Sequence, residues 1–166
     1  DETIFERMIE FIQESGIVTA MVGLLQAPVG TQLYQRMLRE GRIRNIYSGD
    51  NVDGETNIIP KMDLDTLKSG YRKILESIYS AKGFYERVRT FLKDYTPASH
   101  AVTLQWEEIA ALFSSMFQIG VKSKERWDYW KLFFWTLFRF PKKFPLAITF
   151  TIYGYHFRKV NELHVL

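Results

Sequence analysis

One apolar run, residues 17–25, interrupts a chain whose other hydrophobic residues recur with the spacing of helices. The run has the sequence IVTAMVGLL and lacks polar alternation, which is typical of a strand covered on both faces, as in a parallel sheet. A single strand cannot form a sheet. The run therefore predicts that its partner strands lie outside this chain or come from a second copy.

Helices are predicted on both sides of this run. Residues 3–15 place Ile4, Met8 and Ile12 on one face, and Gly16 is a stop signal. Thr31 is expected to cap a second helix that ends at Gly41. Residues 1–41 are thus interpreted as a helix–strand–helix piece of an α/β unit, which favours a chain cut from a larger protein.

The rest of the chain is predicted to be a polar loop, residues 42–62, followed by a helical domain, residues 63–166. Asp63 is expected to cap the first helix of this domain. A later helix is expected to begin at Thr103 and stop at Gly120. Its predicted inward side chains are Trp106, Ile109, Phe113, Met116 and Phe117. The predicted fold class is mainly α, with a short α/β remnant in front.

Composition excludes several kinds of chemistry. The chain has no cysteine, so it has no disulfide, no thiolate zinc site and no thiolate-held iron–sulfur cluster. The three histidines, His100, His156 and His164, lack the spacing of a metal site. No phosphate-binding glycine loop or nucleophile motif is present. We therefore predict no catalytic residue and no metal ligand in this chain.

The C-terminal part is both aromatic and basic. Half of the chain's 26 aromatic residues lie in 127–157, and residues 122–159 hold nine Lys and Arg against two acidic residues. Three interpretations are open: a buried helical hairpin, a patch that dips into a membrane surface, or a platform for single-stranded nucleic acid. Nucleic acid is disfavoured because blocks such as LFFW resemble a core.

The sequence favours a soluble, cytoplasmic protein. The first residues form a charged amphipathic segment rather than a signal peptide. No apolar run reaches the roughly 20 residues that a spanning helix needs. Association with a membrane surface through residues 127–157 is the alternative.

Three stretches carry a family resemblance: GLLQAPVGTQLYQRM, SGDNVDGETNIIPKMD and YRKILESIYSAKGFYERV. Over residues 1–95 the chain resembles the C-terminal region of cobalamin-binding radical S-adenosylmethionine proteins, including the hopanoid C-2 methylase type. It departs from the usual proline–glycine–threonine turn, because Val29 separates Pro28 from Gly30.

The resemblance implies a parent enzyme with a cobalamin domain, and a barrel whose CxxxCxxC motif holds an iron–sulfur cluster. S-adenosylmethionine, the cluster and cobalamin would belong to the parent, which in this subtype would be a methyltransferase. The chain itself would bind no cofactor alone. It would be an auxiliary domain that completes the barrel and helps bind or cover substrate. The alternative is a non-catalytic module that docks on a membrane surface or a protein.

The resemblance also implies site residues. Those expected to contact the adenine of S-adenosylmethionine are Leu25, Gln26 and Ala27. Those expected on the substrate side, from their position in the polar loop, are Asp50, Asn51, Asn57 and Lys61. The predicted partners are the rest of the parent chain and, through the uncovered strand, a second copy.

Overall fold

A computed structural model gives the fold and describes residues 2–46, 49, 54–96 and 106–164. Within these ranges the regular structure is helical and no strand forms, which confirms the mainly α class; an isolated antiparallel bridge joins Ile43 and Ile58. The elements are α1 (Thr3–Glu14), α2 (Gln32–Arg39), α3 (Leu64–Ile78), α4 (Ala81–Asp94), α5 (Trp106–Phe117), the π-turn η1 (Gln118–Lys122), α6 (Arg126–Arg139), the 3₁₀ turn η2 (Pro141–Lys143) and α7 (Phe144–His164).

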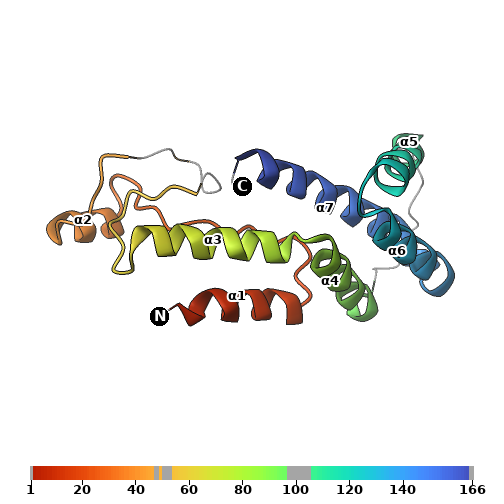
Figure 1. The fold of residues 1–166 in the computed structure, drawn as a ribbon, viewed down its shortest axis with the longest axis horizontal. Coiled ribbons are helices and arrows are strands. Elements are labelled where there is room, and N and C mark those ends of the chain that lie inside the picture. Colours follow the sequence, from red (N-terminus) through yellow and green to blue (C-terminus); the bar gives the residue numbers. More distant parts are fainter. Residues whose placement is uncertain (1, 47–48, 50–53, 97–105, 165–166) are drawn as a thin grey trace.

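The helices form an elongated body built along α3 (Figure 1). Helix α1 packs alongside α3, and α2 lies at one end of the molecule. Helices α5 and α6 lie at the other end, where α4 packs on α6 and α7. The two ends of the molecule are therefore built from different parts of the chain.

The main core lies where α3, α4, α6 and α7 meet. Helices α3 and α4 bury side chains at the three- and four-residue spacing predicted from the sequence: Tyr71, Ile74, Leu75, Ile78, Phe84, Val88 and Leu92. Tyr129 and Leu132 of α6 and Ala147 of α7 join the same cluster. A smaller cluster of Ala27, Met37 and Ile58 anchors α2.

The predicted caps of α2 and α3 are confirmed. The Thr31 hydroxyl accepts the backbone N–H of Tyr34 at 3.2 Å, and the Asp63 carboxylate accepts that of Thr66 at 2.9 Å. Each bond satisfies one of the backbone donors that a helix leaves free at its start. Gly16 adopts φ +69° after α1, a left-handed conformation that turns the chain into residues 17–27.

The predicted strand at residues 17–25 is extended but has no strand partner within the described residues. Within the described residues only one of its two faces is buried. Even-numbered positions pack on the core, with Val18 and Leu24 buried, whereas odd-numbered positions are exposed, and Met21 is 82% exposed. The reason is that the helices described here cover one face of the segment and leave the other uncovered.

The predicted inward face of α5 needs correction. Trp106, Phe113 and Phe117 are exposed, while Ile109 and Met116 are half-buried. Helix α5 packs mainly on α7 and η1, and its Ser115 hydroxyl is hydrogen-bonded to the Tyr129 hydroxyl of α6 at 3.0 Å, so one side of the helix stays uncovered. The predicted stop at Gly120 is also wrong, since the chain continues as η1 to Lys122. The Trp130 indole N–H donates to the Gly120 carbonyl at 2.9 Å. Thr103 lies outside the described residues.

Candidate functional site

Side chains from α4 and from Tyr79, which directly follows α3, hold the beginning of the extended segment, residues 17–27. The Arg87 guanidinium donates to the carbonyls of Ile17 at 3.0 Å and Val18 at 3.2 Å, and it also contacts the Gln13 side-chain oxygen. The Tyr79 hydroxyl donates to the Ala20 carbonyl at 2.8 Å. These bonds replace part of the pairing that a neighbouring strand would supply.

The polar loop holds the other end of the segment. The Thr56 hydroxyl donates to the Leu25 carbonyl at 2.6 Å. The side-chain amide of Asn57 accepts the Ala27 N–H and donates to the Ala27 carbonyl, both at 2.8 Å. Since one amide offers a donor and an acceptor side by side, Asn57 reproduces the paired bonds of an adjacent strand.

The structure brings several predicted site residues together. Asn57 pairs with Ala27, and Leu25 and Lys61 line one groove between α1, α3 and residues 56–62. Leu25 is 68% exposed and Lys61 is exposed, whereas Gln26 and Ala27 are buried. The predicted loop residues Asp50 and Asn51 lie outside the described residues.

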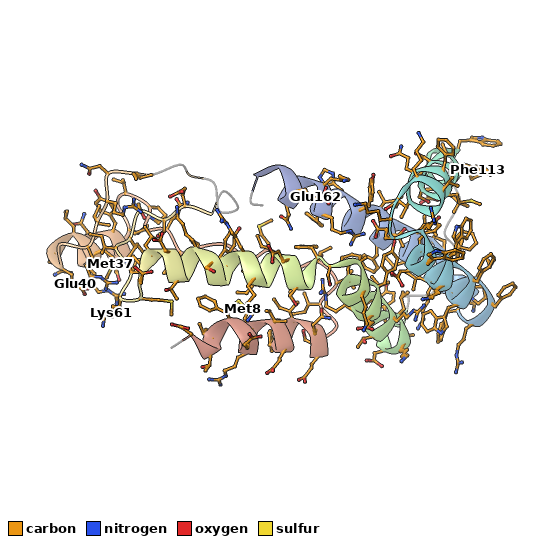
Figure 2. The ribbon with its side chains drawn as sticks, in the orientation of Figure 1. Met8, Met37, Glu40, Lys61, Phe113 and Glu162 are labelled. Carbon is orange, nitrogen blue, oxygen red and sulfur yellow. The ribbon has the colours of Figure 1, made fainter. Side chains whose placement is uncertain are left out.

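The groove has a volume of 460 Å³ and a mostly apolar lining. Figure 2 labels two of its residues, Met8 on the side of α1 that faces α3 and Lys61 on the loop before α3. Other lining residues are Ile4, Phe5, Val22, Leu24, Ile58, Met62, Leu67, Tyr71 and Ile74. Arg42, also in the lining, is engaged with the Ile59 carbonyl at 2.9 Å and with Glu40. Such a groove suits an apolar group, with the Lys61 ammonium at its edge.

Sequence reasoning missed Thr56, Tyr79 and Arg87 as supports of the segment. Arg87 is 1% exposed, and burial lowers its pKa to about 10, so it stays charged at neutral pH. Burial likewise raises the pKa of the Tyr79 hydroxyl. One signal was present for Arg87: it follows Phe84 by three residues and so falls on the buried face of α4.

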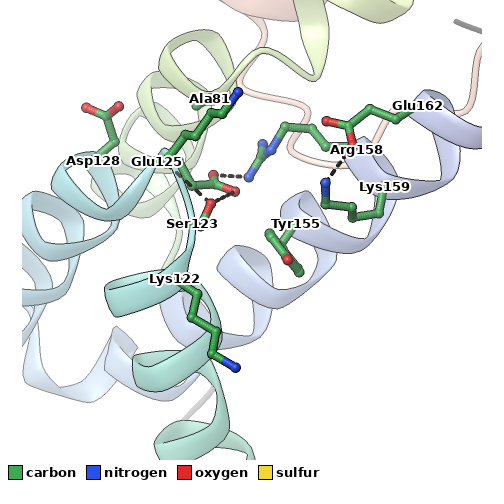
Figure 3. Close-up of a pocket in the computed structure, with 10 residues that line it drawn as sticks. Ala81, Lys122, Ser123, Glu125, Asp128, Tyr155, Arg158, Lys159 and Glu162 are labelled. Carbon is green, nitrogen blue, oxygen red and sulfur yellow. Dashed lines mark hydrogen bonds and ion pairs between the residues drawn. The ribbon is translucent and has the colours of Figure 1, made fainter.

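A second cavity, of 670 Å³, lies between α7 and the turn that joins η1 to α6 (Figure 3). On its wall the buried Glu125 carboxylate pairs with Arg158, which also donates to the Tyr79 carbonyl at 3.3 Å. Burial raises the pKa of the nearby Tyr85 hydroxyl, and the Glu125 charge raises it further. At the rim Lys159 pairs with Glu162 at 2.6 Å. These charges compensate one another and tie α6 and α7 to the end of α3.

The described residues show neither a metal site nor a membrane-spanning helix. They contain no cluster of three or more His, Asp or Glu side chains that could hold a metal ion. Among the helices of the described ranges, none combines the length and apolar character needed to cross a bilayer.

The chain belongs to the family called domain of unknown function DUF4070, whose model matches residues 31–165. It is also similar to an uncharacterized methyltransferase of Synechocystis sp. (strain ATCC 27184 / PCC 6803 / Kazusa), with 29% identity over 163 residues. That match covers 95% of this chain, which spans 30% of the relative's length. No solved structure matches the chain.

Proposed function

We propose that this chain is the auxiliary C-terminal domain of a cobalamin-binding radical S-adenosylmethionine enzyme and is not catalytic alone. In this proposal residues 17–27 form a strand in the wall of the parent barrel. Support comes from the family resemblance of residues 1–95, and from the relative named as a methyltransferase, of which the chain spans 30%. The chemistry would belong to cofactors held by the parent.

One observation carries the proposal: only one face of the extended segment is covered by the core of this chain. Its even-numbered residues are packed on the core, while Ile17, Met21 and Leu25 expose apolar side chains on the opposite face. A strand in a parallel sheet is covered on both faces. The uncovered face is therefore the surface that the remaining barrel would pack against.

The proposed place of S-adenosylmethionine is the end of the segment at residues 25–27, which Thr56 and Asn57 hold. Ligands of parallel sheets bind at the carboxyl ends of strands. Here the Leu25 carbonyl and both polar backbone groups of Ala27 are already bonded to Thr56 and Asn57. The residues present thus fit S-adenosylmethionine through the exposed Leu25 side chain, which would give the adenine an apolar surface. Thr56 holds the Leu25 backbone, and Asn57 holds that of Ala27.

The test is a charge placed on the uncovered face in the full-length parent enzyme. We expect Met21→Glu to lower the free energy of unfolding by about 3 kcal/mol or more, because the carboxylate would be buried unpaired against the barrel. Leu38→Glu is the matched control, since Leu38 is an exposed leucine of α2 outside the segment. Equal stability of the two variants in urea unfolding would overturn the barrel assignment.

Variants of the full-length parent enzyme also test the proposed contact between Leu25 and S-adenosylmethionine. Leu25→Ala should weaken S-adenosylmethionine binding in equilibrium dialysis at unchanged iron content, whereas Leu38→Ala should not. Unaltered binding by Leu25→Ala would remove Leu25 from the proposed site without touching the barrel assignment.

A further inference from the structure

Helices α5 and α6 each carry a stripe of exposed aromatic rings. In both helices the second ring follows the first by seven residues and the third follows four later, which places the three on one helix face. We call these six side chains, Trp106, Phe113, Phe117, Trp127, Phe134 and Phe138, the ring face. They are between 49% and 83% exposed, and Figure 2 shows Phe113 projecting outward from α5.

The ring face is separate from the core side of these helices. On α6, Tyr129, Leu132 and Thr136 are fully buried on the other side. Within the ring face, Phe134 stacks on Phe138 at a centroid distance of 6.2 Å. Phe134 also contacts Trp130 and Phe133, which pack on the core. Single exposed hydrophobic residues are normal, but several large rings exposed along one face of a helix indicate an interaction surface.

Cations accompany the rings. The Lys122 ammonium lies 4.6 Å from the centroid of Phe117, and the Arg126 guanidinium lies 6.0 Å from that of Trp127. Further exposed cations of the same region are Lys131, Arg139 and Lys142. The acidic side chains described on α5, α6 and the turn between η1 and α6 are Glu108, Glu125 and Asp128. Glu125 is buried and pairs with Arg158, and Asp128 pairs with Lys131 at 3.7 Å. The charge of this end of the molecule is therefore predominantly positive.

We propose that the ring face binds the surface of an anionic membrane, with the rings in the headgroup boundary and the cations on lipid phosphates. Rings and cations on one helical surface are the combination that interfacial helices use. The proposal is independent of the proposed function. Figure 1 places α5 and α6 at the end away from α2, whereas residues 17–27 run along α3 toward α2. The two contacts can thus be made together.

Some of residues 127–157, for which the sequence predicted membrane contact, are not available for it in the structure. Phe150, Tyr155 and Phe157 of α7 pack on the core. Lys143 is engaged in the fold, since its ammonium donates to the Leu92 carbonyl at 2.6 Å near the end of α4. We therefore expect the membrane contact on α5 and α6 instead of α7. Because Lys143 supports the fold, its charge is not reversed in the test.

The experiment is cosedimentation of the full chain with vesicles of phosphatidylcholine alone or mixed with phosphatidylserine. We expect binding to the anionic vesicles, weakened between about 0.1 M and about 1 M salt, where the Debye length falls from about 10 Å to about 3 Å. The double variant Phe134→Ser, Phe138→Ser should lose most of the binding. The double variant Lys131→Glu, Lys142→Glu should bind about 25-fold more weakly or worse, because each cation near an anionic surface contributes about fivefold and the two factors multiply.

Matched controls lie elsewhere on the surface. Phe11→Ser removes an exposed ring of α1, and Lys82→Glu reverses an exposed charge of α4; both should bind like the wild type. Circular dichroism of all variants checks that the helices are retained.

Three outcomes would overturn the proposal. The first is no binding to either vesicle. The second is binding that ignores lipid charge and salt. The third is equal loss in the Phe11→Ser control. If the chain binds no vesicles, but the variant Phe134→Ser, Phe138→Ser no longer associates with the rest of the parent, the ring face is a protein interface instead.

Discussion

At the scale of single residues, Arg87 is the side chain on which the extended segment depends most. It is buried and pairs with no carboxylate of the described residues, and its guanidinium is matched by three neutral oxygens, those of Ile17, Val18 and Gln13. Arginine suits this role because its rigid fork can donate in several directions at once. The arrangement links α1, the segment and α4 through one residue.

We expect Arg87→Ala to lower the free energy of unfolding by about 3 kcal/mol or more, since each buried acceptor left unsatisfied costs about 1–3 kcal/mol. Arg87→Met keeps most of the packing but removes the same bonds, so it should be almost as destabilising. Urea unfolding of both variants measures this. Near-wild-type stability of Arg87→Met would show that packing, and not hydrogen bonding, explains the burial of Arg87.

The roles of residues that bond locally could be predicted from the sequence, whereas the roles of residues that bond over long range could not. The caps Thr31 and Asp63 could be placed from sequence, because a cap bonds to backbone only three residues away. Arg87 and Asn57 act across about 70 and 30 residues respectively, on Ile17 and Ala27. A single sequence carries no signal for such long-range pairing.

At the scale of elements, two glycines allow helices to approach closely. A Cβ added to Gly154 of α7 would lie 2.3 Å from the Phe84 ring, and one added to Gly70 of α3 would lie 2.3 Å from the Phe5 ring. The two rings differ in how far they can move to make room for a methyl group. Phe84 is fully buried, whereas Phe5 is half-buried and can turn outward.

Gly154→Ala should therefore destabilise the protein by about 1–3 kcal/mol through overpacking, which outweighs the gain of about 1 kcal/mol in helix propensity. Gly70→Ala should be close to neutral, because Phe5 can move. Thermal and urea unfolding of both variants compare the two cases. A Gly154→Ala variant as stable as Gly70→Ala would mean that α4 and α7 can separate without cost.

The positions of α3 and α4 were predictable because packed amphipathic helices show their spacing in the sequence. The orientation of α5 was not. Its rings have helical spacing, as a buried stripe would, and periodicity alone does not say whether a stripe faces the core or a partner outside the chain.

At the scale of the whole molecule, the uncovered face of residues 17–25 predicts self-association of the isolated chain. An extended segment with exposed apolar side chains is a template for pairing. Light scattering should show a mass that rises with concentration, and Met21→Glu should reduce that rise. A monomer at every concentration tested, for the wild type, would contradict the prediction.

The mainly helical class could be predicted from sequence, whereas the way residues 17–25 are covered could not. A run of apolar residues shows that both faces avoid water, but it does not show which face is covered within the chain. Here only the even-numbered positions, such as Val18 and Leu24, find their cover among the described helices.

The side-chain support of residues 17–27 also bears on how quickly a neighbour can be added. Arg87, Tyr79, Thr56 and Asn57 keep the segment straight before any neighbour arrives. A strand that is already ordered loses little conformational entropy on pairing, so assembly can proceed by rigid docking rather than by folding upon contact. Under the barrel assignment proposed above, the helical body would therefore dock on the rest of its parent without refolding.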